Sequence, residues 1–235
     1  MPIKGVPLLE HWIFSLVEAG IYDIFVNLHH HQDKVAGFLS RPQLADKVHP
    51  VVENRLLGTA ATIRENYRVL RTGPCLVAHC DNWIDTDLSG FIKFHQYRRP
   101  KDTVISMMTF ETDTPESCGI ILTNNRGIVV SMEEKPVNAS SRVANGAVYI
   151  VEAEVVDWIS RYPEIADFST QVIPEFLGRI AEWRNPGLHR DIGSLDSLRR
   201  AQTDSAVPKH APYKDKWTRD FQSHSIHKAL KPSAN

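Results

Sequence analysis

Apolar and polar positions along the first hundred residues predict helices and strands in alternation. Apolar residues recur at helical spacing from Leu8 to Val17, and Pro7 suits the first turn of such a helix. Apolar runs at 23–28 and 74–79 are typical of buried strands, and the second has the character of a strand in a parallel sheet. Repeated units of this kind indicate parallel strands joined by helices. The pattern also predicts helices near 32–39, 60–70 and 88–97, and a short strand near 51–52.

The pattern changes after residue 103. Three strand-like runs, 103–111, 119–123 and 127–134, follow with short breaks, and the Asn-rich second break ends in Gly127, as hairpin connections do. We therefore expect an α/β fold: a Rossmann-like, mostly parallel (mixed) sheet flanked by helices, with a small antiparallel β excursion. The pattern further predicts a strand at 146–151, helices at 155–159 and 171–181, and a last helix at 195–201 that Ser194 caps.

Length and pattern predict one α/β domain at 1–203 and a polar tail at 204–235. A chain of 235 residues is long enough for one sizeable core. From about residue 203 the apolar period fades into Pro, Lys, His and Ser, so we expect this tail to be poorly ordered or loosely docked.

Composition and net charge limit the classes of binding partner that we expect. Hydrophobic residues make up 42% and charged residues 23%, and the net charge of −1 comes without a long basic run, so neither nucleic acid nor an anionic membrane is an expected partner. No apolar stretch approaches the roughly 20 residues of a membrane span. Three cysteines without metal-type spacing predict reduced thiols and a cytoplasmic location. A homo-oligomer is compatible with this composition.

Two acidic residues stand where ligands bind in α/β sheets. Asp81 directly follows the strand at 74–79, and a carboxylate at the end of a strand can reach a ligand or hold Mg²⁺. Asp191 lies in a Gly-containing loop before the last helix. The alternative for each is a local role in capping or turn formation. Two such carboxylates can share a metal if both loops open on the same side of the sheet, which spacing alone does not decide.

Two further sites carry phosphate-binding chemistry. Lys135 stands between Glu134 and Pro136 at the end of a predicted strand, where its point charge suits a phosphate. Gly58 precedes a predicted helix, whose first N–H groups are available to an acceptor or an anion. A solvated lysine and a plain helix start are the alternatives.

Taken in order, these motifs resemble one family. The sequence contains E-x-x-x-L-G-T-A from Glu53, C-D-N at 80–82, E-K-P at 134–136, N-G-A-V-Y-I at 145–150 and R-D-I-G-S at 190–194. This order is similar to that of the sugar-1-phosphate nucleotidyltransferases, especially the members that resemble mannose-1-phosphate guanylyltransferase. The resemblance extends from residue 1 to about residue 201.

The resemblance implies an enzyme that joins a nucleoside triphosphate to a sugar 1-phosphate, giving a nucleotide sugar and pyrophosphate. GTP and mannose 1-phosphate (or a related hexose or heptose phosphate) are the first expectation, with UTP and CTP open. It implies that Asp81 and Asp191 hold Mg²⁺ and that Lys135 grips the sugar phosphate. It further implies a sugar pocket bordered by Glu134, Asn145 and Gly146, and base contacts from Glu53, Leu57, Gly58 and Thr59.

The sequence departs from the family pattern in two places. Family members open with a strand and a Gly-x-Gly-Thr-Arg loop that cradles the triphosphate, whereas this sequence begins in the following P-I-x-G-x-P-L segment, so we expect about 25 residues to be missing. No other Gly-rich phosphate loop occurs. Ala147 stands near a family glycine, which leaves the sugar contact there open. The alternative function is therefore a non-catalytic binding or regulatory subunit, or an inactive fragment.

Overall fold

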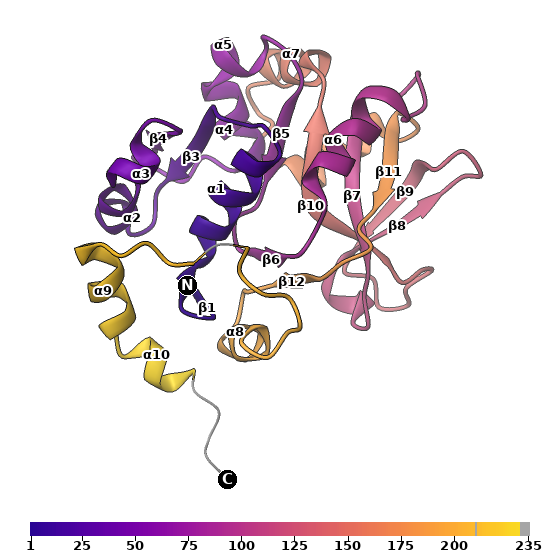
Figure 1. Cartoon of the computed structure of the whole chain (residues 1–235). Coiled ribbons are helices and arrows are strands. Elements are labelled where there is room, and N and C mark those ends of the chain that lie inside the picture. The colour runs from indigo at the N-terminus through magenta and orange to yellow at the C-terminus, as the bar shows by residue number, and fades with distance from the viewer. Residues whose placement is uncertain (210, 231–235) are drawn as a thin grey trace. The chain divides into compact units, whose positions relative to one another are not determined.

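The computed structural model describes residues 1–209 and 211–230, and their contacts divide the chain into two compact units (Figure 1). Unit 1 combines residues 1–52, 80–88 and 187–235, and unit 2 combines residues 53–79 and 89–186. No helix in the described part of the chain is long and apolar enough to cross a membrane.

In unit 1 the described strands form two-stranded ladders. One ladder is parallel, as the alternation of helices and strands predicts, and two are antiparallel. The parallel ladder is β3 (Ile24–Leu28) with β4 (Val48–Val52), and the antiparallel ladders are β1 (Pro2–Ile3) with β2 (Val6–Pro7) and β6 (Asn82–Ile84) with β12 (His189–Asp191). The helices are α1 (Leu8–Glu18), α2 (Gln32–Leu39), α3 (Pro42–Ala45), α8 (Leu195–Ala201), α9 (Lys216–Ser223) and α10 (Ile226–Ala229).

The residues after 203 include α9 and α10, and a buried arginine binds this segment to the rest of unit 1. Arg41, 5% exposed, donates to Thr218 Oγ1 at 3.3 Å and Asp215 Oδ2 at 3.4 Å, and pairs with Glu10 Oε2 at 2.5 Å. Its guanidinium also lies over the rings of Phe38, Tyr213 and Trp217. These contacts attach α9 to the rest of unit 1. The expectation that the tail is poorly ordered or loosely docked stays a prediction.

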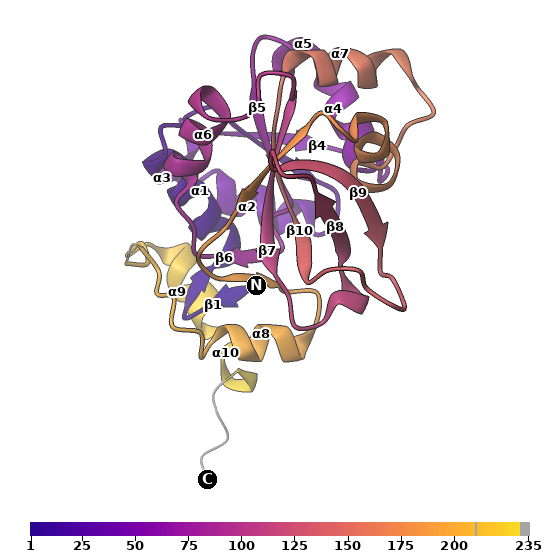
Figure 2. The same cartoon turned by 90° about the vertical axis from the view of Figure 1, so that its right-hand side faces the viewer.

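Unit 2 is built on one mixed sheet of six strands. Its order is β5 (Cys75–Ala78), β10 (Val143–Val151), β7 (Ile105–Glu111), β11 (Ile180–Arg184), β9 (Ile128–Glu134) and β8 (Gly119–Thr123). The hairpin of β8 and β9 confirms the predicted antiparallel excursion (Figure 2). The α/β class and the mixed sheet are also confirmed.

The sheet of unit 2 is not mostly parallel, although the sequence pattern predicts that it is. Within this sheet only β7 and β11 pair in parallel, and β5, which the sequence indicates as a strand of a parallel sheet, pairs antiparallel with β10 at the edge. An apolar run indicates a strand but carries no information about the direction of its neighbour, and the residues of β5 are only half-buried.

Helices cover both faces of this sheet. On one face α6 (Leu88–Tyr97) packs Phe91 against Trp183, with ring centroids 5.1 Å apart. On the other face the apolar core joins Met107 and Tyr149 of the sheet to α4 (Thr59–Glu65), α7 (Ala153–Arg161) and the turns at 168–176.

The predicted helix at 171–181 is wrong. The chain forms a π-helical turn at Phe168–Val172 and a 3₁₀ turn at Ile173–Phe176, then enters β11 at Ile180. Pro174 and Gly178 (φ +85°) interrupt the helix, and the apolar residues after them pair with β7.

The buried His95 on α6 predicts a pH-dependent stability. This side chain is 2% exposed, with Nδ1 2.8 Å from Ser106 Oγ and Nε2 3.3 Å from Glu152 Oε1. Burial, and then the charge of Arg99, lower its pKa, while Glu152 opposes the shift. The unfolded chain therefore binds a proton at His95 more readily than the folded protein does. The neutral ring contributes fully to the free energy of unfolding above pH about 6.5, and this contribution is lost as the pH falls below that value.

Chemical unfolding at pH 8 and pH 5 tests this expectation. The wild-type protein should lose more unfolding free energy between the two pH values than His95→Gln, since all other histidines are common to both proteins. Equal losses would contradict the assignment to His95.

Candidate active site

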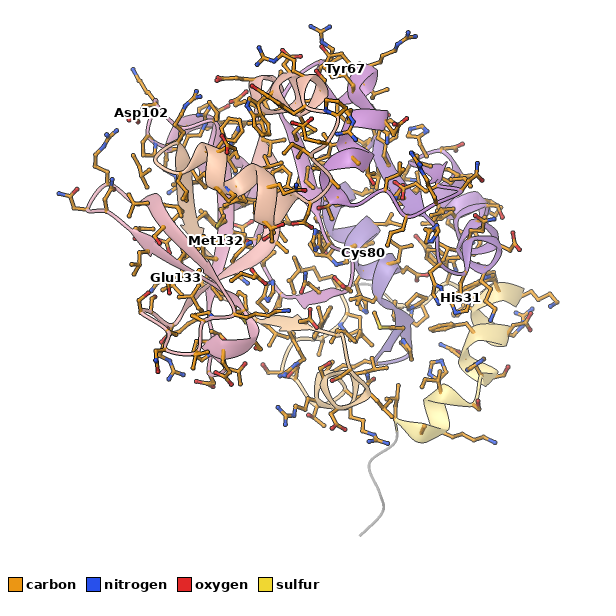
Figure 3. The ribbon with its side chains drawn as sticks, turned by 180° about the vertical axis from the view of Figure 1, so that it is seen from behind. His31, Tyr67, Cys80, Asp102, Met132 and Glu133 are labelled. Atoms are coloured by element: carbon orange, nitrogen blue, oxygen red, sulfur yellow. The ribbon has the colours of Figure 1, made fainter. Side chains whose placement is uncertain are left out.

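In unit 1 the β6–β12 ladder brings two separated acidic residues to one end. Asp191, the last residue of β12, pairs with Asn82, and the Ile192 N–H donates to the Asp81 carbonyl at 3.0 Å. Both acidic side chains are exposed. Cys80, which precedes Asp81, is labelled in Figure 3. The backbone of this ladder therefore places Asp81 and Asp191, the two acidic residues that the sequence singles out, at neighbouring positions.

Asp191 has a local role as well. Its Oδ1 accepts the Gly193 N–H at 2.6 Å, and a Cβ on Gly193 would lie 2.7 Å from the same oxygen, so a side chain at this position would displace the Asp191 carboxylate. Ser194 caps α8 in a reciprocal capping box with Ser197, which confirms the predicted cap. The turn thus uses one oxygen of Asp191, and the other makes no hydrogen bond within the described residues.

The carboxylates of Asp81 and Asp191 suit a hard cation that takes most of its ligands from water and substrate. Among the described residues no group of three or more His, Cys, Asp or Glu side chains could hold a metal ion. Two exposed carboxylates suit Mg²⁺, which usually binds one or two protein carboxylates and completes its shell with water and substrate phosphate.

In unit 2 a buried carboxylate shapes the loop at 57–60. Glu53 is 5% exposed, and its Oε2 accepts the Leu57 N–H at 3.3 Å while its Oε1 accepts the hydroxyl of Thr62. Gly58 has φ +96°, and a Cβ there would lie 2.6 Å from the Ala166 carbonyl oxygen. Glu53 thus supports the loop that carries Leu57, Gly58 and Thr59.

Two of the N–H groups expected to be available at the start of α4 already have an acceptor within unit 2. The N–H groups of Ala60 and Ala61 donate to the Ala166 carbonyl at 2.8 and 3.2 Å. The Thr59 hydroxyl in turn accepts the Phe168 N–H at 2.7 Å. Residues more than a hundred positions away therefore satisfy this helix start, a contact that no local pattern reveals.

The second group of expected residues in unit 2 gathers beside β8 and β9. Glu134 lies directly opposite Gly119, where a Cβ would be 2.9 Å from Glu134 Oε2 and 3.8 Å from Asn145 Cβ. Figure 3 labels Met132 and Glu133, which precede Glu134 on β9. Gly119 therefore makes room for the Glu134 carboxylate beside Asn145. Sequence reasoning missed this residue, although a glycine within a strand signals a close approach.

Asn145 to Ala147 form an irregularity in β10. The register with β7 shifts between Asn145 and Tyr149, and Asn145 Oδ1 accepts the Ala147 N–H at 3.0 Å. Asn145 Nδ2 donates to the Tyr149 hydroxyl at 2.7 Å, and burial raises the pKa of that hydroxyl. Gly146 is buried within this bend, and Ala147 has φ +52°.

Replacing Ala147 with glycine is expected to stabilise the protein by roughly 0.5–1 kcal/mol. The left-handed backbone costs alanine about 1–2 kcal/mol, which exceeds the entropic cost of glycine. Denaturant unfolding measures the change. Ala144→Gly, in the regular part of the same strand and fully buried, should instead destabilise. A loss of stability in Ala147→Gly would contradict the expectation.

Lys135 is exposed and has a strained backbone. Its φ is +47°, and its N–H donates to the Cys118 carbonyl at 2.9 Å. Its ammonium group has no hydrogen-bond partner within the described residues, so it is available to an anionic ligand. Non-glycine residues in this conformation cost about 1–3 kcal/mol and cluster at ligand-binding sites.

Comparison with known proteins identifies the family. The family model described as nucleotidyl transferase matches residues 1–207, most of the chain. The chain belongs to this nucleotidyl transferase family. The match covers unit 2 whole and contains Asp81 and Asp191 of unit 1.

Individual relatives of this nucleotidyl transferase are distant. A mannose-1-phosphate guanylyltransferase of Mycobacterium tuberculosis is 23% identical over 87% of this chain and 57% of its own length. A UTP–glucose-1-phosphate uridylyltransferase of Synechocystis is 25% identical over 75% of this chain and 49% of its own length. The chain spans about half the length of the curated relatives it matches.

A solved structure confirms the fold of the nucleotidyl transferase chain. HddC from Yersinia pseudotuberculosis, crystallised with GMP-PN, superposes with a TM-score of 0.72 at 21% identity, covering 86% of this chain and 87% of that one. At this identity the likeness establishes the fold.

Proposed function

We propose that this nucleotidyl transferase joins a nucleoside triphosphate to a sugar 1-phosphate. The sugar phosphate oxygen attacks the α-phosphorus, forming a new P–O bond. The bond between the α-phosphorus and its bridging oxygen breaks, and pyrophosphate leaves with the electron pair. Catalysis of such a step consists mainly of alignment and neutralisation of phosphate charge.

The observation that carries the proposal is the β6–β12 ladder. It joins Asp81 and Asp191, about 110 residues apart in the sequence, at one exposed end. Carboxylates that only cap turns have no need of one another, whereas a shared cation explains why both stand at this end.

The proposal assigns roles to the residues of each unit. In unit 1 Asp81 and Asp191 would hold Mg²⁺, which when bound neutralises and orients phosphate oxygens. In unit 2 Lys135 offers its positive charge to the sugar phosphate, and the loop at 57–59 contacts the base with Glu53 as its support. Glu134, Asn145 and Gly146 form the sugar side.

GTP and a mannose or related hexose or heptose 1-phosphate are the proposed substrates. Two names support this choice: the guanylyltransferase of Mycobacterium tuberculosis and HddC crystallised with GMP-PN. Because one relative is a uridylyltransferase, UTP is the alternative nucleotide to be tested. A cytoplasmic location belongs to the proposal and is supported by three cysteines, none of them in a disulfide within the described chain.

Pyrophosphate release tests the proposal. The purified chain is assayed with Mg²⁺, four nucleoside triphosphates and a panel of sugar 1-phosphates, beside a version preceded by a Gly-x-Gly-Thr-Arg segment. Release that requires both substrates, in either version, supports the proposal and names them. Binding of nucleotide or sugar phosphate without release in either version favours the non-catalytic binding subunit.

A further inference from the structure

One segment of unit 2, residues 166–168, supports the whole loop at 57–60. The Ala166 carbonyl accepts two N–H groups at the start of α4, at 2.8 and 3.2 Å, and comes so close to Gly58 that no Cβ would fit. The Phe168 N–H donates to the Thr59 hydroxyl at 2.7 Å, and that hydroxyl lies 3.4 Å from Asp167 Oδ2. The loop is therefore shaped by contacts from outside its own stretch of sequence.

Asp167 divides its two oxygens between different tasks. Oδ1 accepts the N–H and the hydroxyl of Thr170, both at 2.7 Å, and so caps the π-helical turn at Phe168–Val172. Oδ2 accepts the Thr59 hydroxyl. Capping a helix start requires only one side-chain oxygen, so Asp167 Oδ2 is not needed for the cap.

The electrostatic surroundings keep this carboxylate charged. Partial burial raises its pKa, but hydrogen bonds from Thr170 and Thr59 and the charge of His79 outweigh burial, so that the pKa lies below its ordinary value. At neutral pH both oxygens therefore accept hydrogen bonds. Thr59 can donate to Asp167 while it accepts from Phe168, which fixes the direction of its hydroxyl.

We propose that Asp167 is a positioning residue for the nucleotide, acting through Thr59 on the loop at 57–60. The inference rests on the proposed function, because that function assigns the loop to the base. The residue after this segment contacts the expected sugar side, since Ser169 Oγ lies 3.4 Å from Asn145 Nδ2. Loss of the Oδ2 contact should therefore affect the nucleotide and leave the sugar phosphate alone.

Asp167→Asn separates the two tasks of the side chain. Asparagine caps as well as aspartate, so the turn persists, but an amide nitrogen at the position of Oδ2 offers Thr59 a donor where it needs an acceptor. We expect KM for the nucleoside triphosphate to rise roughly tenfold, the effect of losing one hydrogen bond to a charged group. KM for the sugar 1-phosphate and kcat should stay within about twofold of wild type, since neither depends on this contact in the proposal.

Asp157→Asn is the matched control. Asp157 lies on α7 and accepts the Tyr67 hydroxyl at 2.9 Å, so this variant also removes a hydrogen-bonded carboxylate from unit 2 without touching the loop. Its kinetic constants should equal those of wild type. Thermal unfolding of both variants checks that each is folded.

The possible results distinguish failure of the positioning role of Asp167 from failure of the proposed function. An unchanged KM for the triphosphate in Asp167→Asn, or a parallel rise in both KM values, overturns the positioning role. If the wild-type chain shows no turnover, the proposed function fails, and calorimetric binding of GTP decides the inference instead. Roughly tenfold weaker binding by Asp167→Asn alone then supports it, and equal binding by all three proteins overturns it.

Discussion

Asp81→Asn and Asp191→Asn are each expected to lower Mg²⁺-dependent pyrophosphate release by at least about a hundredfold, comparable to removing one preorganised electrostatic group from an active site. Asparagine retains the shape of the side chain but not its charge, so a site of two carboxylates loses half of its negative charge. The fold should persist, because the ladder beside these residues is held by backbone hydrogen bonds. Initial rates measured across a Mg²⁺ titration report the change.

Asp196→Asn is the control for this pair. Asp196 is exposed on α8, close in sequence to Asp191, and among the described residues it pairs only with Arg199, at 3.3 Å. Its substitution should leave the rate unchanged. If the two carboxylates share one ion, the double variant should be little worse than either single variant. Unchanged turnover in either single variant would remove that residue from the assignment, and additive losses would argue against a shared ion.

Gly58→Ala is expected to destabilise the protein by roughly 2–4 kcal/mol and to raise KM for the nucleoside triphosphate. Two costs add at this position. The backbone at φ +96° and ψ 160° lies in a region that is essentially limited to glycine, which costs alanine about 1–3 kcal/mol, and the added Cβ would lie 2.6 Å from the Ala166 carbonyl oxygen, which forces the two segments apart. Denaturant unfolding and steady-state kinetics measure the two effects.

Gly178→Ala measures the cost of a positive φ without a close contact. Gly178 has a similar φ of +85° in the same unit, and a Cβ there would meet no atom within 4 Å. This variant should lose only about 1–2 kcal/mol and keep its KM for the triphosphate. Equal losses in the two variants would show that the contact with Ala166 does not constrain the loop.

The sequence predicts the parts of the site that depend on near neighbours. Ser194 caps its helix because serine before an apolar period does so in most contexts, and the hairpin of β8 and β9 follows from its turn residues. Glu134 and Asp191 also end their strands and Gly58 precedes its helix, as the adjacent Pro and Gly residues indicate.

The parts that sequence reasoning missed depend on distant partners. The end of the helix expected at 171–181 instead belongs to β11, because β7 supplies a ladder that no local propensity registers, and Pro174 and Gly178 interrupt the helix before it. Asp167 and Ala166 act on a loop more than a hundred residues earlier. The D-F-S-T sequence at 167–170 indicates a helix cap but not the use of its second oxygen.

The discontinuous build of unit 1 sets an order of assembly during synthesis. Every residue of unit 2 has left the peptidyl transferase centre before Asp191 is added, whereas β6 must wait for β12. At roughly 5–20 residues per second, the ribosome needs on the order of 5–20 seconds to travel from Asp81 to Asp191. The last residue of unit 2 precedes Asp191 by only five positions, about one second or less at these rates, so the candidate acidic pair is completed just after unit 2 and is the last part of the proposed site to mature.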